Sequence, residues 1–574
     1  MGFKSMMDGL NLKTWTASVF AAFLFGTVSA QAQDFAFWAK SNLSGSGFAR
    51  FGNFTIEKKW SRGVYETNGY QPLFLDESLN WRNQVQEVRS VLTSAHFKGL
   101  NANEYWNSYF DELISQPGLE AKFSAEVLLT HALTLYLRDL NVGRLPQSAM
   151  TSQTQFKKKE FVRFSEIPGL IVSNVPLPQA VMAFEPQSED YQRLLNELRR
   201  ILEIGKSQWL TVASSGVLRP GQSHASDVLS LRQKLTQLGY SVPSQGSAYD
   251  NPLQSVVMDF QRNSLLAADA VVGPQTRRRL NISFDNYVNL LRISLEKWRW
   301  LPTNLYFPNL SRPTQKHDRF VFVNVAHQNL KLFEFGQRVM QMPVIAGKPE
   351  HKTPQRIDFM ATITINPFWT VPRGVLERTI LPAAAENPNY FTLNRFRITD
   401  SSGREINPSS VNWKNPDRNQ VFSWTYRQFP GPNNALGFFR FDLATGDEYY
   451  LHHTSASNLP IFATPDRLAS SGCVRLSDPT AVAEYAFQVI GSKETKLSTS
   501  EPFRGDRDQI LSIIANPEAY PSQRIPLARS FYVYLTYFTV EFDDQGRPKV
   551  ASDAYGQDQA LLTELNRPAG VLPR

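Results

Sequence analysis

The sequence predicts a multidomain α+β protein, in which a helical N-terminal half precedes a strand-rich C-terminal half. The chain has 574 residues, which corresponds to two to four domains at roughly 100–200 residues per domain. Apolar residues recur at helical spacing up to about residue 280, and from Arg319 they alternate or run together as in strands. With 42% hydrophobic and 20% charged residues, the composition excludes a disordered chain. The net charge of +8 permits an anionic polymer as a partner without requiring one.

The first residues are typical of a secretory signal. Lys4 and Lys13 precede an apolar run over residues 17–28, and small-residue sites follow, ending at Ala32. The run is shorter than the about 20 residues that a membrane span needs. We therefore predict a signal peptide over residues 1–32 and an exported protein, with an uncleaved membrane anchor as the alternative.

Residues 34–215 are predicted to form a helical scaffold domain. Apolar residues fall on a helical repeat in Ala125–Leu137 and again in Tyr191–Ile204. His131 lies within the first of these segments, where we expect a hydrogen-bonded core histidine. The Ser- and Gly-containing break from Ser214 to Gly221 marks a domain boundary.

Residues 225–282 are predicted to form a three-helix module. The apolar face of the first helix, Val228 to Leu238, ends at the C-cap candidate Gly239, the second helix carries Phe260, and the third begins at Pro274. Its LGY, DFQ and VVGPQT motifs resemble those of the type-1 peptidoglycan-binding domain. A helical linker domain that binds nothing is the alternative.

The third helix of this module carries three consecutive arginines, Arg277, Arg278 and Arg279. A solvated charged face is the expected role of such a cluster. Contact with an anionic glycan-peptide is the alternative.

The strand-rich region is predicted to form a domain over residues 290–500, completed by C-terminal strands within 501–574. Strands are expected over Phe320–Val325, Leu330–Phe335, Met340–Ile345, Met360–Ile365 and Phe531–Val540, with a hairpin turn at Asp544–Gly546. The stretch 374–432 shows no periodicity, so we expect an irregular lid or binding loop there. A helix is predicted from Pro479, capped by Ser477 or Asp478.

Cys473 is the only cysteine, so an intrachain disulfide and a thiolate zinc cluster are both excluded. A lone cysteine is most often a buried apolar residue, but an unpaired thiol in an exported protein indicates either a partner in an intermolecular disulfide or a reactive group. Ser471 and Gly472 let the backbone turn closely around the thiol. The amides of Gly472 and Cys473 are then candidate oxyanion donors, and the helix that follows adds its positive dipole end.

Two adjacent histidines, His452 and His453, precede the cysteine by about 20 residues at the end of a predicted strand. Adjacent strand residues face opposite sides, so only one of the two can activate the thiol. Tyr450, His452 and Thr454 share one face, and parity alone does not choose between the histidines. The same geometry excludes them as a metal-binding pair, and no metal or cofactor is expected.

Tyr-Leu-His452-His-Thr454, followed by Ser-Ser-Gly-Cys473-Val-Arg475, resembles the signature of the L,D-transpeptidase (YkuD) catalytic domain. The resemblance implies a β-rich catalytic domain with a capping subdomain. It also implies that Cys473 is the nucleophile, that His452 is the general base and acid, and that Gly472 contributes to the oxyanion site. Arg475, Ser471 and Tyr450 are the substrate-binding residues that it implies, with a structural ion pair as the alternative for Arg475.

Further motifs resemble those of large periplasmic members of this family from Gram-negative bacteria, which also carry a scaffold and a peptidoglycan-binding domain. They lie at 297–302, 347–354, 365–372 and 430–437. Two departures stand out: His453 replaces the Gly or Asp that is more usual there, and the interval from His452 to Cys473 is slightly long.

The resemblance implies a periplasmic, monomeric enzyme that forms 3→3 cross-links between peptidoglycan stem peptides through a cysteine thioester, with loss of D-Ala. Its partners would be a tetrapeptide donor, a diamino-acid acceptor amine and other cell-wall synthesis proteins, and not nucleic acid; carbapenems would acylate Cys473. Three alternatives stay open: hydrolysis of the same thioester, transfer to a lipoprotein lysine, and a non-catalytic wall-binding protein. A papain-like protease is disfavoured, because its cysteine precedes its histidine in the chain.

Overall fold

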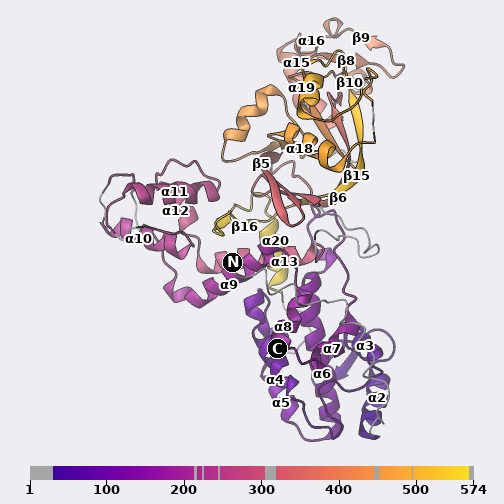
Figure 1. Cartoon of the computed structure of the whole chain (residues 1–574), viewed down its shortest axis with the longest axis vertical. Helices are drawn as coiled ribbons and strands as arrows, with labels where there is room; N and C mark the ends of the chain where they lie inside the picture. The colour runs from indigo at the N-terminus through magenta and orange to yellow at the C-terminus, as the bar shows by residue number, and fades with distance from the viewer. Residues whose placement is uncertain are drawn as a thin grey trace.

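The computed structural model describes residues 30–212, 216–222, 225–243, 246–303, 305, 319–444, 451–493 and 496–567. The molecule is elongated: a helical domain forms one end, a small helical module projects sideways, and a strand-rich domain forms the other end (Figure 1). Most of the predicted signal peptide, residues 1–29, lies outside the described residues, and the first described helix begins at Ala30.

The N-terminal domain is built around one long buried helix, α6 (Leu119–Val142), which confirms the helix predicted over Ala125–Leu137. His131 is 2% exposed and its Nδ1 lies 3.2 Å from Ser61 Oγ, so it is the expected core histidine. The elements around α6 are α2 (Ala30–Leu43), β1 (Phe48–Phe51), β2 (Phe54–Glu57), α3 (Lys58–Thr67), α4 (Gln84–Thr93), α5 (Ser108–Ser115), α7 (Ile167–Val172), α8 (Leu177–Ala180) and α9 (Glu189–Ile204). Short 3₁₀ turns connect them: η1 (Ala95–Lys98), η2 (Ala102–Glu104), η3 (Gln147–Ala149), η4 (Phe164–Glu166), η5 (Val181–Phe184) and η6 (Lys206–Gln208).

The predicted three-helix module is confirmed as α10 (Ala225–Gln237), α11 (Asn251–Asn263) and α12 (Pro274–Leu280). Gly239 follows α10 in the left-handed region, with φ +88°. The buried Gln261 side chain holds the module together, because its amide nitrogen donates to the Val271 carbonyl and to Thr276 Oγ1, both at 3.1 Å. The long helix α13 (Phe284–Trp300) then leads into the strand-rich domain.

The strand-rich domain is a curled nine-stranded sheet with the order β13-β5-β14-β12-β11-β6-β15-β3-β4. Because β4 also pairs with β5, eight of the strands close into a barrel. The strands are β3 (Arg319–Asn324), β4 (Asn329–Glu334), β5 (Gln337–Gly347), β6 (Arg356–Ile365), β11 (Phe439–Leu443), β12 (Leu451–His452), β13 (Leu468–Ser470), β14 (Val474–Leu476) and β15 (Gln523–Thr536). The predicted hairpin at Asp544–Gly546 joins β16 (Val540–Phe542) to β17 (Pro548–Val550).

Alternation along β3 explains why the sheet is covered on both faces. Val321 and Val323 point into the barrel core, which is closed on one side by α18 (Pro479–Tyr485), the π-helical η10 (Ala486–Ile490) and α19 (Arg507–Ala515). Phe320 and Phe322 point the other way, and Phe322 stacks on Trp298 of α13 at 5.6 Å between ring centroids. Helix α13 therefore packs directly on the outer face of this sheet.

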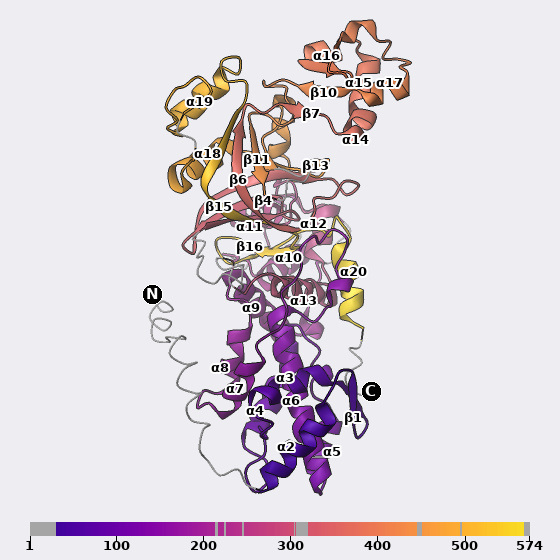
Figure 2. The ribbon, with the colours of Figure 1, turned by 90° about the vertical axis from the view of Figure 1, so that its right-hand side faces the viewer.

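The expectation that residues 374–432 are irregular is wrong. This stretch folds into a separate subdomain with its own apolar core, formed around Phe391, Trp413 and Tyr426. Its elements are α14 (Arg373–Val375), the π-helical η7 (Leu376–Ile380), α15 (Leu381–Glu386), α16 (Tyr390–Leu393), η8 (Pro408–Ser410) and α17 (Arg418–Ser423), with a sheet of order β7-β10-β8-β9. The sheet strands are β7 (Trp369–Thr370), β8 (Phe396–Thr399), β9 (Glu405–Ile406) and β10 (Thr425–Gln428). Figure 2 shows this cap on the β13 side of the barrel, with α18 and α19 on the other side.

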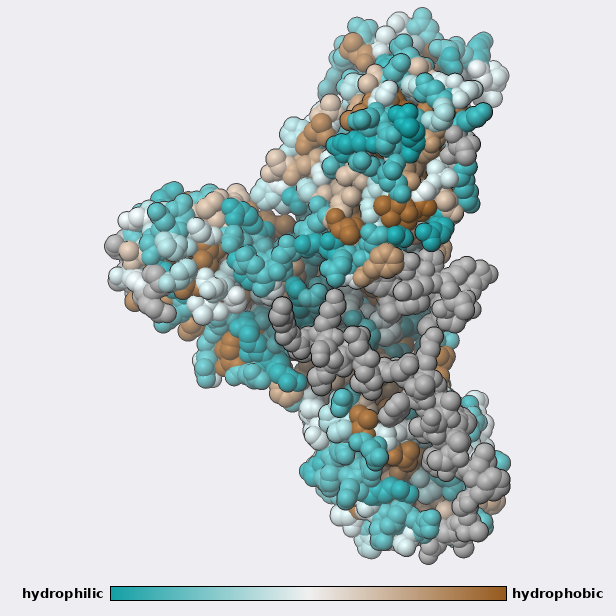
Figure 3. Space-filling model, in the orientation of Figure 1, coloured by the Kyte–Doolittle hydropathy of each residue, from teal (hydrophilic) through white to brown (hydrophobic). Residues whose placement is uncertain are grey.

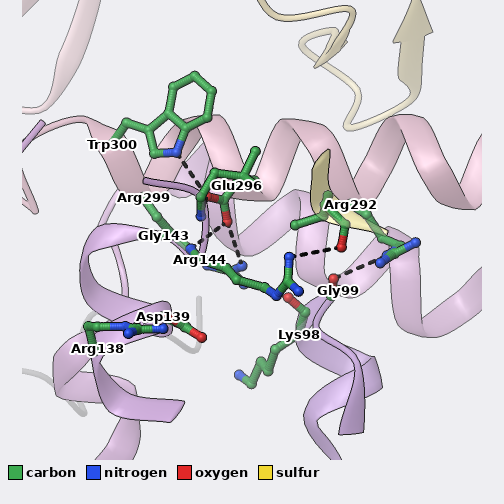
Figure 4. A network of polar contacts seen from close by, with 12 residues as sticks. Lys98, Gly99, Arg138, Asp139, Gly143, Arg144, Arg292, Glu296, Arg299 and Trp300 are labelled. Atoms are coloured by element: carbon green, nitrogen blue, oxygen red, sulfur yellow. Dashed lines mark hydrogen bonds and ion pairs between the residues drawn. The ribbon is translucent and has the colours of Figure 1, made fainter. Parts of the chain in front are cut away.

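A buried carboxylate joins the N-terminal domain to α13 (Figure 4). Glu296 accepts hydrogen bonds from the backbone amide of Arg144 (3.0 Å) and from Trp300 Nε1 (2.9 Å). The Arg144 side chain in turn donates to Glu104 at 2.7 Å and to the carbonyl of Leu565 at 3.0 Å, in the C-terminal helix α20 (Gln557–Leu565). These contacts tie the N-terminal domain, α13 and the C-terminal segment into one framework.

The face of the molecule in Figure 3 is mainly hydrophilic, with apolar residues scattered singly or in small groups. None of the helices within the described residues combines the length and the apolar character that a membrane span requires.

Candidate active site

The register between two short parallel strands decides which histidine faces the cysteine segment. In the β12–β14 pair, Leu451 lies opposite Val474 and His452 lies opposite Arg475. Leu451 and Val474 both point into the barrel core. His452 and Arg475 therefore share the other face of the sheet, which neither parity nor spacing could establish from the sequence.

Cys473 directly precedes β14, two residues before Arg475, so an extended chain places both side chains on the same face. The thiol is half-buried. The electrostatics of Arg475 agrees with its lying close to Cys473. Burial lowers the pKa of Arg475, whereas the charge of Cys473 raises it. Cys473, Arg475 and His452 thus form one cluster at the end of the parallel pair.

His452 is 3% exposed. Burial, and next the nearby charge of Arg475, lower the pKa of His452 to about 3, while the carbonyls of His453 and Leu436 act weakly in the other direction. The imidazole is therefore neutral at physiological pH, which is the form that a general base requires, and the lowered pKa makes it a weaker base than a free histidine.

Three polar atoms beside the cysteine are buried and have no hydrogen-bond partner among the described residues: His452 Nδ1, Thr454 Oγ1 and Arg475 Nε. Unpaired buried polar atoms are costly and therefore rare in a folded protein. The three atoms belong to residues of the two motifs that carry His452 and Cys473.

The turn before Cys473 is closed by the hydroxyl of Ser470. Ser470 Oγ donates to the Cys473 carbonyl at 2.6 Å and accepts from the Gly472 amide at 3.1 Å. The Gly472 N–H is therefore engaged in this conformation, which changes our expectation for it as an oxyanion donor. Ser471 is exposed at the tip of the turn, and Tyr450 lies outside the described residues.

A second layer of hydrogen bonds holds the turn from below. The buried Thr353 hydroxyl donates to the Gly472 carbonyl at 2.7 Å and accepts from the Gly347 amide at 2.9 Å. Tyr555, from the C-terminal segment, donates its hydroxyl to the Gly347 carbonyl at 2.5 Å and accepts from the Thr353 amide at 3.1 Å. Thr353 lies in one of the motifs quoted above, but no sequence signal pointed to Tyr555.

Close backbone approaches explain the glycines around the site. A Cβ on Gly347 would lie 2.1 Å from the His351 carbonyl oxygen and 3.1 Å from Gly472 Cα. Gly437 has φ +61°, and a Cβ there would lie 2.5 Å from His453 Nδ1. Larger residues at either position would displace the backbone that carries the reactive groups.

His453 packs away from the cysteine face. Its ring stacks on Phe438 at 5.7 Å between centroids, and its Nδ1 accepts from the Phe438 amide at 3.4 Å. Burial lowers the pKa of His453 to about 4. Within the described residues, no three His, Cys, Asp or Glu side chains stand together as metal ligands.

Three segments of the chain match family models. Residues 59–198 match a "Scaffold domain", residues 224–280 match a "Putative peptidoglycan binding domain", and residues 318–494 match the "L,D-transpeptidase catalytic domain" (YkuD). The matched catalytic segment contains His452, Cys473 and Arg475 but not Tyr555.

A curated protein of Haemophilus influenzae named "Putative L,D-transpeptidase" is 30% identical to this chain over 255 residues. The similarity covers 43% of this chain and 46% of that protein, so the chain spans about half the length of the curated relative. Among solved structures, an L,D-transpeptidase of Xylanimonas cellulosilytica is 18% identical, with 49% of this chain and 94% of that chain covered and a TM-score of 0.15. An L,D-transpeptidase of Stackebrandtia nassauensis is 13% identical, with 48% and 90% covered and a TM-score of 0.20. By their family-model matches, three segments of the chain are thus similar to a scaffold domain, to a peptidoglycan-binding domain and to the L,D-transpeptidase catalytic domain of the YkuD family.

Proposed function

We propose that this protein is a peptidoglycan L,D-transpeptidase that forms 3→3 cross-links between stem peptides through a thioester on Cys473. The observation that carries the proposal is the β12–β14 register. In this register His452 and Arg475 lie on the face of the sheet to which we assign the Cys473 side chain. The family match of residues 318–494 supports an enzyme of this class that acts on peptidoglycan.

In the first step, the Cys473 Sγ attacks the carbonyl carbon between the third residue of a tetrapeptide stem and its terminal D-Ala. The neutral His452 imidazole takes the thiol proton and delivers it to the departing D-Ala amine as the C–N bond breaks. The first step thus leaves a thioester on Cys473 and free D-Ala.

In the second step, the side-chain amine of a diamino acid in a neighbouring stem attacks the thioester carbonyl. His452 takes the ammonium proton as the new amide forms, and returns it to the departing thiolate. The thioester conserves the energy of the broken amide, so the transfer needs no nucleotide and no cofactor.

Arg475 is assigned to a substrate carboxylate, because its buried Nε has no hydrogen-bond partner among the described residues and lies beside the reacting groups. We assign the oxyanion donor to the Cys473 amide rather than to that of Gly472, whose N–H is held by Ser470. Ser471 and Tyr450 are proposed to contact the stem peptide at the rim.

The folded cap over residues 374–432 favours transfer over hydrolysis. A subdomain with its own core can cover the thioester as a rigid body and limit the access of water. Hydrolysis, which would make the protein an L,D-carboxypeptidase, and transfer to a lipoprotein lysine use the same Cys473 and His452. They differ only in the nucleophile that opens the thioester.

The proposed enzyme acts in the periplasm as a monomer, where carbapenems would acylate Cys473. The proposed division of the chain is a signal peptide (1–32), a scaffold domain (34–215), a peptidoglycan-binding domain (225–282), a catalytic domain (290–500) with its cap (374–432), and a C-terminal segment that completes it (501–574).

The test is incubation of the purified protein with a disaccharide-tetrapeptide, with and without an added lysine peptide, followed by mass analysis of the products. A dimer that has lost one D-Ala supports transpeptidation. A tripeptide monomer alone supports hydrolysis, and a product that contains an added lysine peptide supports transfer to lipoprotein. Unchanged substrate, identical to that recovered with the Cys473→Ala variant, would contradict an acyl-transfer function.

A further inference from the structure

A cavity of about 690 Å³ lies where the peptidoglycan-binding module meets α13 and the C-terminal segment. Its walls come from α12, α13, the strand β17 and the helix α20, which gather at the middle of the molecule (Figure 2). The volume is within the range of ligand-binding cavities, roughly 300–1,000 Å³. None of the residues assigned to the reaction lines it.

The structure separates the three consecutive arginines of α12 by their contacts. Arg277 turns back into its own module, where its guanidinium donates to the carbonyls of Gly216 and Val272. Arg278 and Arg279 instead line the cavity. Within the described ranges, neither side chain has a carboxylate in ion-pair distance or a hydrogen-bond acceptor.

Neither guanidinium group forms an ion pair with another described residue, and Arg278 is exposed. Arg279 is half-buried, and burial, followed by the positive charge of Arg278, lowers its pKa. An anion bound between the two groups would relieve both effects, because it replaces the lost hydration and screens the repulsion.

The acidic residues that line the cavity have other hydrogen-bond or ion-pair partners and form no ion pair with Arg278 or Arg279. Asp553 accepts from the Tyr537 hydroxyl and from the Gln557 amide, both at 3.0 Å. Asp558 forms a buried ion pair with Lys297. The cationic end of the cavity is therefore open to an external carboxylate.

The rest of the lining is mostly apolar and is formed in part by Leu290, Ile293, Val550 and Leu562. A small inorganic anion would leave this surface uncovered. A peptide with carboxylates and small apolar groups, such as the methyl groups of alanine, would fill both parts.

We propose that this cavity is a second peptidoglycan site, which binds the carboxylates of a stem peptide through Arg278 and Arg279. The proposal rests on peptidoglycan being the polymer on which the enzyme acts. It places the site between the module, α13 and the C-terminal segment, and not on the surface of the three-helix module alone.

The position of the cavity gives the second site a role in orienting the wall polymer. Asp553 lines the cavity, and two residues later Tyr555 supports the Gly347 and Thr353 backbone beneath the nucleophile turn. One short turn therefore joins the wall of the cavity to the frame of the active site. A peptidoglycan chain whose stem peptide is bound by Arg278 and Arg279 would be held at a constant position relative to Cys473.

The experiment uses the full-length chain with Cys473→Ala, so that the probe, a disaccharide-tetrapeptide, is not consumed. Titration calorimetry measures binding for this protein, for the added pair Arg278→Gln and Arg279→Gln, and for Arg277→Gln as the matched control from the same helix turn. We expect at least a tenfold loss of affinity at one of two sites for the pair and less than a twofold change for the control. Hydrogen exchange on the protein without arginine substitutions should show ligand protection in residues 278–293 and 548–562.

Equal binding by the pair and by the control would overturn the proposal, as would protection confined to the catalytic domain. A neutral chitin oligosaccharide that competes fully with the tetrapeptide would also overturn it, because the site would then recognise glycan and not carboxylate. Acylation of Cys473 in the wild-type chain is measured separately by mass. Protection at the cavity without acylation of Cys473 would support the second site and contradict the transpeptidase function. Acylation of Cys473 without protection at the cavity would support the transpeptidase function and overturn the second site.

Discussion

The hydroxyl of Thr353 is the contact on which the position of the nucleophile turn should depend most. Thr353→Val keeps the shape of the side chain but removes the donor to the Gly472 carbonyl and the acceptor for the Gly347 amide. Both backbone groups are buried, and each unpaired buried group costs about 1–3 kcal/mol. Part of this free energy is lost as stability, and part is recovered when the turn shifts to find other partners.

A shift of the turn moves Cys473, because Gly472 directly precedes it. If the misplaced thiol raises the activation free energy of acylation by about 1.4–2.8 kcal/mol, the acylation rate falls about tenfold to a hundredfold. KM should change less than threefold, because neither lost hydrogen bond touches the substrate. The assay is the rate of Cys473 acylation by a saturating stem tetrapeptide, followed by intact-protein mass, together with thermal unfolding of the same sample.

Two companion variants separate positioning from general destabilisation. Thr353→Ser keeps the hydroxyl and should retain a rate within about threefold of wild type. Tyr555→Phe removes the hydroxyl that holds Gly347 and the Thr353 amide, one step further from the turn, and should reduce the rate by about threefold to tenfold. A Thr353→Val protein that unfolds at a lower temperature but acylates at the wild-type rate would refute the reasoning.

Four further predictions address the reacting groups and the frame. Cys473→Ala and His452→Ala should abolish product formation with unchanged folding, whereas His453→Gly should retain most activity. An equal loss of product formation in His452→Ala and His453→Gly would mean that the general base is assigned to the wrong histidine. Arg475→Gln should raise the pKa of His452, because the Arg475 charge lowers it. An NMR titration of the imidazole in the Cys473→Ala background measures this shift. An unchanged pKa of His452 would mean that the charge of Arg475 does not act on the imidazole. Gly347→Ala should lower both the unfolding temperature and the acylation rate, since its Cβ would collide with backbone. Gly273→Ala, where nothing lies within 4 Å of the added Cβ, is the control. Glu296→Gln should destabilise the chain by about 1–3 kcal/mol in chemical denaturation without changing the acylation rate of the folded protein. A slower acylation by Glu296→Gln would mean that the contact between the N-terminal domain and α13 affects the active site.

Regular periodicity made the elements of the barrel predictable. The strands expected at 320–325, 330–335, 340–345 and 360–365 all occur, because buried strands in a closed sheet leave long apolar or alternating runs. The cap over 374–432 leaves no such signal. Its helices and strands are two to six residues long, and its core consists of aromatic residues spaced irregularly along the chain. Short elements held by tertiary packing carry too few residues for a period to be visible.

The active-site cluster was predictable to the level of single residues in some places and not in others. The motif around Cys473 pointed to the thiol, and the resemblance pointed to His452, but residue parity alone left both histidines open. The geometric reason for preferring His452 is the register of β12 on β14, which is a long-range property. The sequence favoured Ser471 in the turn, yet the hydroxyl of its neighbour Ser470 closes it. Tyr555 reaches the site through tertiary structure alone, so no local pattern could reveal it.

The barrel extends beyond the segment that matches the catalytic-domain model. That segment ends at residue 494, but β15 pairs with β3 on one side and with β6 on the other, and it fills the gap between them in the barrel. Without β15, both neighbouring strands would expose an unpaired edge and the apolar core on Val321 and Val323 would open to water. Tyr555, the support of the nucleophile turn, follows β15 in the chain. The C-terminal segment therefore completes the sheet and also, through Tyr555, supports the backbone beneath the turn that precedes Cys473.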